Sequence, residues 1–582
     1  MPLRPLRILG STALSLLIAG SAGGPSLAIA PPGDGAVTPE ACAALGFSAP
    51  GRNGQDSIVV TATKRTSRER KTASPNYAPP PPPPPPPPAS MSYSAAPYPS
   101  VSPAPLSIPP VRDTEKYPGA AANPVKRVAE EPVSTFSIDV DTAAYANVRR
   151  FLNEGAAPPR DAVRVEELIN YFDYGYARPT AKEPPFKSTV TVVPSPWSTD
   201  RQLMHIGVQG YATPKAGQPP LNLVFLIDTS GSMSGPDRLP LAQKALNVLI
   251  DQLRPGDRVS MVAYAGSAGA VLSPTDGRSK LKMRCALTAL HSGGSTAGGE
   301  GLKLAYDLAK QNLDPKAVNR VILVTDGDFN VGIADPARLK DFVADQRKSG
   351  VYLSVYGFGR DNYNDTMMQA LAQNGNGTAA YVDSLQEARK LLRDDFDGAL
   401  FPIADDVKIQ VEFNPAKVSE YRLIGYETRL LNREDFNNDQ VDAGEVGSGA
   451  AVTAIYEITP AGARPSSDPL RYGASAPPTT GGGELAFLKI RYKPPGGSTS
   501  KLIERPIGAS DVRASLAAAP EATRFAVAVA AYGQKLRGDP WVDTSFDWNA
   551  VTSLAQGARG EDPYGLRAEF VQLTRAAKDV KR

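Results

Sequence analysis

The chain has 582 residues and a formal net charge of +3. This length exceeds what one hydrophobic core usually serves, so we expect about two to four domains. The small net charge gives no argument for nucleic acid or an anionic membrane surface as a partner. The only histidines are His205 and His291, which disfavours a His-rich zinc site and leaves few choices for a Ser-His-Asp triad.

Residues 1–30 have the pattern of an export signal. Arg4 and Arg7 precede an apolar run over 8–19, which is short for a membrane span, and small residues follow. We therefore expect an exported protein of the periplasm or cell envelope of a Gram-negative bacterium. An uncleaved short anchor, which would leave the chain associated with the membrane, is the alternative.

Residues 31–122 are rich in Pro, Ala, Ser and Gly, and Pro79–Pro88 is an unbroken run of proline. This composition predicts a disordered, proline-rich linker, with a ligand for a proline-binding module as the alternative. Cys42 lies in this stretch, far along the chain from Cys285. We therefore expect no structural disulfide.

One segment of the linker differs from the rest. Residues 56–65, DSIVVTATKR, contain a short β-prone core in a polar setting. Such a segment can add as a strand to the exposed edge of a partner's sheet. It resembles the segment near the start of TonB-dependent outer-membrane receptors, which implies a TonB-type contact. A chance match is the alternative, because short β-prone strings are common.

Regular structure is expected again from residue 123. Residues 134–140 alternate and then meet Asp141 and Thr142, a good pair for a helix N-cap, and Gly155 is placed to end that helix. A second helix is predicted over 163–172, and strands over 187–193 and 203–209.

From residue 221 to about residue 400, short apolar runs alternate with helical patterns. This alternation predicts a Rossmann-like α/β domain, with a mainly parallel sheet and helices on both faces. Ligands of such sheets bind at the carboxyl ends of the strands. The expected strands are 221–227, 259–264, 270–272, 320–325, 352–358 and 378–382.

After residue 401 the pattern changes to strands with alternating polarity, followed by a helical C-terminus over 511–537 and 550–581. Neither this region nor 123–220 has enough strands for two sheets alone. We therefore expect that the two β-rich regions form one sandwich into which the α/β domain is inserted. The later strands are expected at 407–413, 418–426, 451–458, 484–492 and 501–506.

Three separated pieces of sequence share one chemistry. Asp228, Ser230 and Ser232 follow the first apolar strand of the α/β domain, Thr296 lies in a Gly/Ser/Thr loop, and Asp326 ends another apolar strand. Carboxylate and hydroxyl oxygens are hard ligands of the kind that hold Mg²⁺. Because all three pieces fall at one edge of the predicted sheet, we expect a metal site there.

These pieces resemble the metal-ion-dependent adhesion site (MIDAS), DxSxS…T…D, of the von Willebrand factor type A (VWA) domain family. The resemblance implies that Ser230, Ser232 and Thr296 give hydroxyl ligands to Mg²⁺, and that Asp228 and Asp326 act directly or through water. It leaves one coordination position for a carboxylate from a protein partner.

The flanks resemble a bacterial envelope group of VWA proteins. Residues 133–176 resemble its VWA-associated N-terminal region, and 421–447 and 555–574 resemble its C-terminal domain of unknown function. The expected domains are therefore 123–220, 221–400 and 401–582, after the signal at 1–30 and the linker at 31–122.

The sequence favours a binding protein rather than an enzyme, with an acidic group on a protein as its target. No nucleic-acid partner or small-molecule substrate is indicated. A metal-dependent hydrolase of phosphate esters is the alternative, against which Ser230 stands where a second Asp is wanted and no P-loop exists. A scaffold with a vestigial metal site is a third interpretation. The acidic segment at 435–442 lacks EF-hand spacing, and we interpret it as a solvated turn.

Overall fold

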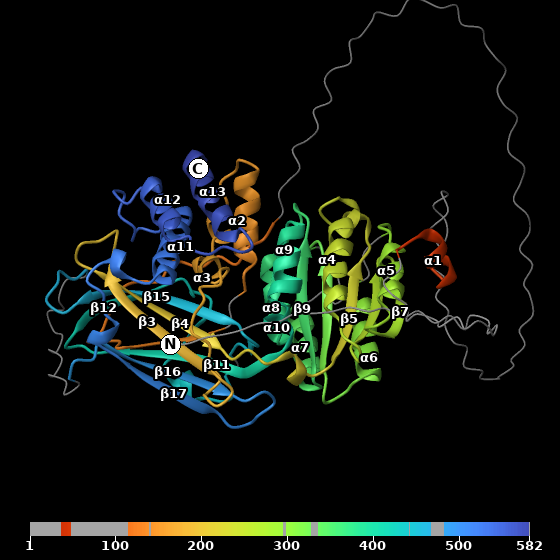
Figure 1. Ribbon diagram of the computed structural model, residues 1–582, viewed down its shortest axis with the longest axis horizontal. Coiled ribbons are helices and arrows are strands. Elements are labelled where there is room, and N and C mark those ends of the chain that lie inside the picture. The colour runs from red at the N-terminus through yellow and green to blue at the C-terminus, as the bar shows by residue number, and fades with distance from the viewer. Residues whose placement is uncertain are drawn as a thin grey trace, which may run out of the picture.

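The computed structural model describes seven parts of the chain, and it contains an α/β domain, a β-sandwich and a layer of helices on the sandwich (Figure 1). The expected export signal, the 56–65 segment and the proline run lie outside the described residues. None of the helices in the described parts is long and apolar enough to cross a membrane. The described parts are 36–47, 115–138, 141–294, 298–327, 336–441, 443–466 and 482–580.

The α/β domain has a six-stranded sheet in the order β10-β9-β8-β5-β6-β7. All neighbouring strands are parallel except β6 and β7, which confirms the expected fold class. The central strand β5 is buried along its whole length because helices cover both faces of the sheet. The strands are β5 (Leu221–Asp228), β6 (Arg258–Tyr264), β7 (Ala268–Asp276), β8 (Val318–Thr325), β9 (Val351–Phe358) and β10 (Ala379–Val382).

Alternate side chains of β5 enter two different cores. Phe225 and Ile227 belong to the core under α4 and α5, whereas Val224 and Leu226 belong to the core under α6, α7 and α8. The domain ends with α9, a π-helical turn over Lys390–Asp394, and α10. The helices are α4 (Leu239–Gln252), α5 (Lys280–Thr288), α6 (Gly298–Gln311), α7 (Pro336–Lys348), α8 (Asp365–Asn374), α9 (Leu385–Arg389) and α10 (Phe396–Leu400).

The expected sandwich is confirmed. One sheet has the order β1-β12-β15-β4-β3 and the other the order β13-β2-β11-β16-β17, with β14 paired to β11. Each sheet joins strands from before and after the α/β domain, since β4 pairs with β15 and β2 with β11. The strands are β1 (Lys126–Arg127), β2 (Val133–Ser137), β3 (Phe186–Pro194), β4 (Gln202–Gly210), β11 (Pro402–Phe413), β12 (Val418–Ile424), β13 (Leu430–Leu431), β14 (Val446–Gly447), β15 (Ala451–Pro460), β16 (Ala486–Lys493) and β17 (Lys501–Ile507).

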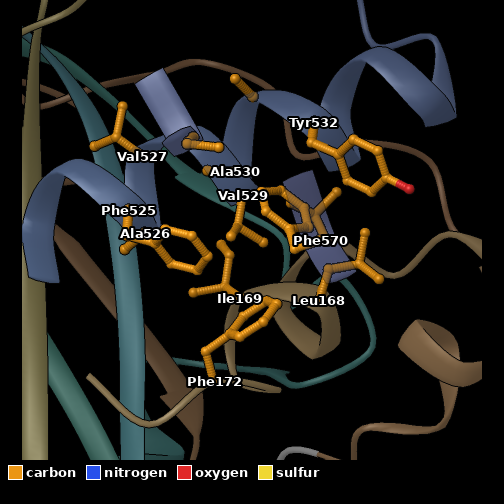
Figure 2. Close-up of a cluster of buried hydrophobic side chains, with 14 of the residues drawn as sticks. Leu168, Ile169, Phe172, Phe525, Ala526, Val527, Val529, Ala530, Tyr532 and Phe570 are labelled. Carbon is orange, nitrogen blue, oxygen red and sulfur yellow. The ribbon is translucent and has the colours of Figure 1, made fainter. Parts of the chain in front are cut away.

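A layer of helices covers one face of the sandwich (Figure 1). Figure 2 shows its core, where Phe172 meets Phe525 and Phe570 edge-to-face with ring centroids 5.0 and 5.5 Å apart. Helices from before and after the α/β domain therefore share one core. They are α2 (Ala143–Asn153), α3 (Val165–Ile169), α11 (Glu521–Arg537), α12 (Trp548–Gly557) and α13 (Leu566–Asp579).

Two expected helical stretches are shorter than the sequence pattern indicated. The stretch expected over 511–537 becomes helix α11 only after Pro520, which stands at the N-cap position without a side-chain cap hydrogen bond. The stretch expected over 550–581 is divided into α12 and α13, because the chain turns between them and Gly565, with a positive φ of 74°, precedes α13.

The N-terminal stretch contradicts two expectations. Residues 36–47 contain a short helix, α1 (Pro39–Ala44), which the Thr38 side chain caps by accepting from the backbone of Ala41. This helix lies against α5, and a disulfide joins Cys42 to Cys285. The expectation of no disulfide is therefore wrong, because Cys42 lies in ordered structure. The expected disordered linker is wrong for 36–47 and for 115–122, where Lys116 bridges to Asn364.

Buried charges join the α/β domain to the layer of helices. Arg149 of α2, which is 3% exposed, donates to Asp383 and Glu387 of the α/β domain and to Glu569 of α13. We call these four residues the junction cluster. Tyr171 also donates to Glu387, at 2.7 Å. Paired charges thus join the α/β domain to the layer of helices.

Asp141 has a different role from the helix cap that the sequence predicted. Helix α2 begins at Ala143 as expected, but the Thr142 side chain makes no cap hydrogen bond. The Asp141 carboxylate instead accepts from the backbone of Ala379 at 2.9 Å and from Arg429 at 3.0 Å. It therefore links the α/β domain to the later part of the sandwich region.

Candidate metal centre

The first piece of the predicted site lies where the central strand of the α/β sheet ends. Asp228 is the last residue of β5, between β6 and β8, and is completely buried. The chain then enters a short 3-10 helix, Gly231–Ser234. The hydroxyls of Ser230 and Ser232 lie 3.0 Å apart. The strand end therefore brings one carboxylate and two hydroxyls together.

Hydrogen bonds fix the Asp228 carboxylate. Its Oδ1 accepts from the backbone N–H of Ser230 at 2.8 Å, and its Oδ2 accepts from the hydroxyls of Tyr264 at 3.1 Å and Thr325 at 3.3 Å. Burial and, to a smaller extent, the nearby charge of Asp326 raise the pKa of Asp228 to about 6, against the lowering effect of the hydrogen bonds from Ser230 and Tyr264. A nearby cation would favour the ionised form of this carboxylate.

Asp326 directly follows β8 and has no exposed surface. Neither of its carboxylate oxygens has a hydrogen-bond partner among the residues that the structure describes. The guanidinium Nη1 of Arg238 lies 3.8 Å from its Oδ2. A buried carboxylate without hydrogen bonds is costly, so the donor set at this strand edge fits a bound cation.

Thr296, the fifth predicted ligand, lies outside the described residues. The start of its loop runs along the loop after β5. Gly293 donates to the carbonyl of Thr229 at 2.8 Å, and Gly231 donates to the carbonyl of Gly294 at 3.0 Å. The structure thus gathers Asp228, Ser230, Ser232 and Asp326 at one edge of the sheet and places residues 293–294 against the loop after β5.

Two functional neighbours were missed from the sequence. Tyr264 ends β6 and Arg238 precedes α4, and neither belongs to the motif. The position of Tyr264 could have been found, since it ends the strand beside β5. Nothing in the sequence pattern marks Arg238.

The other candidate residues lie elsewhere. His205 is buried between Tyr176 and Thr523 on the helix-covered sheet. In the acidic turn, Asp439 accepts from Arg491 at 2.9 Å and from the hydroxyl of Ser500. Over the described ranges, no three His, Cys, Asp or Glu side chains are placed to share a metal ion. A cation at the strand edge would therefore depend on two carboxylates and on hydroxyls.

Comparisons with known proteins agree with this architecture. Family models match three consecutive regions: von Willebrand factor over 111–205, von Willebrand factor type A domain over 222–394, and the C-terminal region of uncharacterized protein YfbK over 398–580. Uncharacterized protein YfbK of Escherichia coli K12 is 46% identical over 478 residues, which cover 80% of this chain and 82% of that protein.

More distant similarities were found as well. Inter-alpha-trypsin inhibitor heavy chain H4 of Homo sapiens is 26% identical over 203 residues, which cover 34% of this chain and 22% of that one. The structure of a von Willebrand factor type A protein from Catenulispora acidiphila matches with a TM-score of 0.39 and 18% identity, over 69% of this chain and 97% of that one.

VWA domains generally serve as protein-interaction modules rather than as enzymes. The VWA model covers the strands and loops that carry Asp228 and Asp326, and the close relative covers most of the chain. This chain therefore belongs to the von Willebrand factor type A domain proteins, in the group that shares the YfbK C-terminal region.

Proposed function

We propose that this protein captures an acidic group on a protein partner through a divalent cation that is held at the edge of the VWA sheet. The cation that we propose is Mg²⁺. Asp228, Ser230, Ser232, Thr296 and Asp326 would hold the cation, directly or through water. The single observation that carries the proposal is the buried Asp326 carboxylate, whose oxygens have no hydrogen-bond partner in the described structure.

The chemistry of the donors supports a carboxylate as the target. Ser230 and Ser232 contribute neutral oxygens, and Asp228 already accepts three hydrogen bonds from the protein. A cation with so little negative charge around it keeps a strong attraction for an incoming Glu or Asp oxygen. The residues at this edge therefore favour recognition of an acidic side chain over hydrolysis, for which they offer no general base.

The disulfide supports export as part of the proposal. The disulfide between Cys42 and Cys285 links helix α1, near the N-terminus, to helix α5 of the VWA domain. Disulfides form and persist in oxidising compartments such as the periplasm. We propose a location in the periplasm or cell envelope, which this disulfide and the signal pattern of residues 1–30 support. The TonB-type contact through 56–65 remains a prediction.

The test is a capture experiment from envelope extract. The wild-type chain and the variants Asp228→Ala and Thr296→Ala are immobilised, and proteins retained in Mg²⁺ but released by EDTA are identified. We expect a partner that both variants fail to retain, and whose binding is lost when one of its acidic side chains is neutralised. A partner that binds unchanged in EDTA would contradict the adhesion mechanism.

A further inference from the structure

The guanidinium of Arg238 lies beside the metal centre. Arg238 immediately precedes α4, and its Nη1 donates to the backbone carbonyl of Ser232. The same nitrogen lies 3.8 Å from Oδ2 of Asp326. The Arg238 side chain is 16% exposed, whereas that of Asp326 is fully buried. A fixed positive charge therefore faces the carboxylate that lacks a hydrogen bond.

The loop after β9 holds this guanidinium in place. Nη2 of Arg238 donates to the carbonyl of Arg360 at 2.6 Å and lies 3.8 Å from the Asp361 carboxylate. Gly359 has a positive φ of 72°, and a Cβ there would come within 2.4 Å of Cγ and Nε of Arg238. Glu115 accepts from the backbone of Asp361 and steadies the loop. The side chain of Arg238 thus occupies space that is available only because residue 359 is glycine.

We infer that Arg238 is a built-in counter-cation of the metal centre, which stabilises Asp326 when no metal is bound and lowers the affinity for a divalent cation. The inference rests on the proposed function. Like charges at such short range in a partly buried site repel strongly. The backbone contacts hold the guanidinium near Asp326, so an incoming cation has to bind against this charge. Arg238 would then set the cation concentration at which the adhesion site becomes active.

A purely structural role predicts the opposite sign. If Arg238 only steadied the loop that carries Ser232, its removal would loosen that loop and weaken cation binding. If it opposes the metal, its removal strengthens cation binding, provided that the fold is kept. The direction of the change in affinity therefore separates the two roles.

The experiment is a calorimetric titration of Mg²⁺ and Mn²⁺ into the full chain, comparing wild type with Arg238→Gln and Arg238→Met. The methionine variant keeps the unbranched stem under Gly359, in case the glutamine variant fails to fold. Arg360→Gln is the matched control, since its side chain is exposed and pairs with Glu154. We expect at least about tenfold tighter binding in the Arg238 variants and no change in the control.

A second readout uses thermal unfolding with EDTA and with Mg²⁺. Removing Arg238 should lower the midpoint in EDTA, because Asp326 loses its nearest cation, and should enlarge the rise that Mg²⁺ produces. Affinity that is equal or weaker in the folded Arg238 variants would overturn this inference and leave the metal site intact. Absence of any cation binding to the wild type and to the Arg238 variants would instead overturn the proposed function.

Discussion

The junction cluster and the metal centre both bury carboxylates, but Asp326 of the metal centre differs from the junction carboxylates in its donors. Asp383 and Glu387 accept from Arg149, and Glu387 also accepts from Tyr171. Among the residues that the structure describes, Asp326 has no hydrogen-bond donor, and the Arg238 guanidinium lies 3.8 Å away. Paired and hydrogen-bonded charges thus join the α/β domain to the helices at the junction, whereas Asp326, which lacks such hydrogen bonds in the described structure, is the carboxylate that we propose to take a cation.

The largest expected effect lies at the junction. Arg149→Met would leave Asp383 and Glu387 buried without their main cation, and we expect a loss of about 3–5 kcal/mol in the free energy of unfolding. Urea unfolding followed by circular dichroism measures it. The control Arg393→Met removes an exposed arginine that pairs with its neighbour Asp394, and should change stability by less than about 0.5 kcal/mol. A similarly small loss in Arg149→Met would refute the distinction between the two sites.

The next effect concerns the metal centre. Mg²⁺ at about 100 times its dissociation constant should stabilise the wild type by about 2.7 kcal/mol relative to EDTA. Asp228→Ala should abolish this difference, because it removes a carboxylate from the cation site. Thermal unfolding of both proteins in Mg²⁺ and in EDTA measures it, with Arg393→Met expected to behave as the wild type. Equal stabilisation of Asp228→Ala would show that Mg²⁺ binds elsewhere.

The disulfide should have a smaller effect. Replacing both Cys42 and Cys285 by serine should lower the stability of the VWA domain by about 2 kcal/mol, because the cross-link restricts the unfolded chain. Urea unfolding of this variant, compared with the wild type under non-reducing conditions, measures it. Mg²⁺ stabilisation should be unchanged. Two titratable thiols in the native protein under non-reducing conditions would contradict this account.

The smallest effect is a pH dependence that arises away from both sites. Burial lowers the pKa of His205 to about 4, from an ordinary value of 6.5. The unfolded chain therefore binds a proton below pH 6.5 that the folded chain binds only near pH 4. As a result, His205 leaves the free energy of unfolding unchanged above pH 6.5 and lowers it progressively as the pH falls from 6.5 towards 4. We expect the wild type to lose about 1–2 kcal/mol more than His205→Gln between pH 7 and pH 5, measured by urea unfolding of both proteins at the two pH values. An unchanged pH profile in the variant would assign the loss to other groups.

The fold was largely predictable because its elements have strong local patterns. The apolar run of β5 and its alternation with helices indicated a parallel sheet, and the shortage of strands in each flank indicated a shared sandwich. The disulfide could not be predicted, since the helix around Cys42 is short and is held by its contact with α5. The role of Asp141 was missed because its partners, Ala379 and Arg429, are distant in sequence.

The candidate site was predictable only as far as its motif. Asp228, Ser230, Ser232 and Asp326 follow strand ends, and the order of parallel strands is enough to place them at one edge. Arg238 was missed because its position depends on the loop after β9 and on space left by Gly359. Such a contact between loops has no periodicity or spacing in the sequence.

The most direct test of the central claim is a calorimetric titration of Mg²⁺ into the purified wild-type chain and into Asp326→Asn. We predict one binding site per chain in the wild type and no measurable binding in the variant, with circular dichroism showing that both are folded. No binding to the wild type, or the same binding to Asp326→Asn, would contradict the claim that the buried carboxylate is kept for a cation.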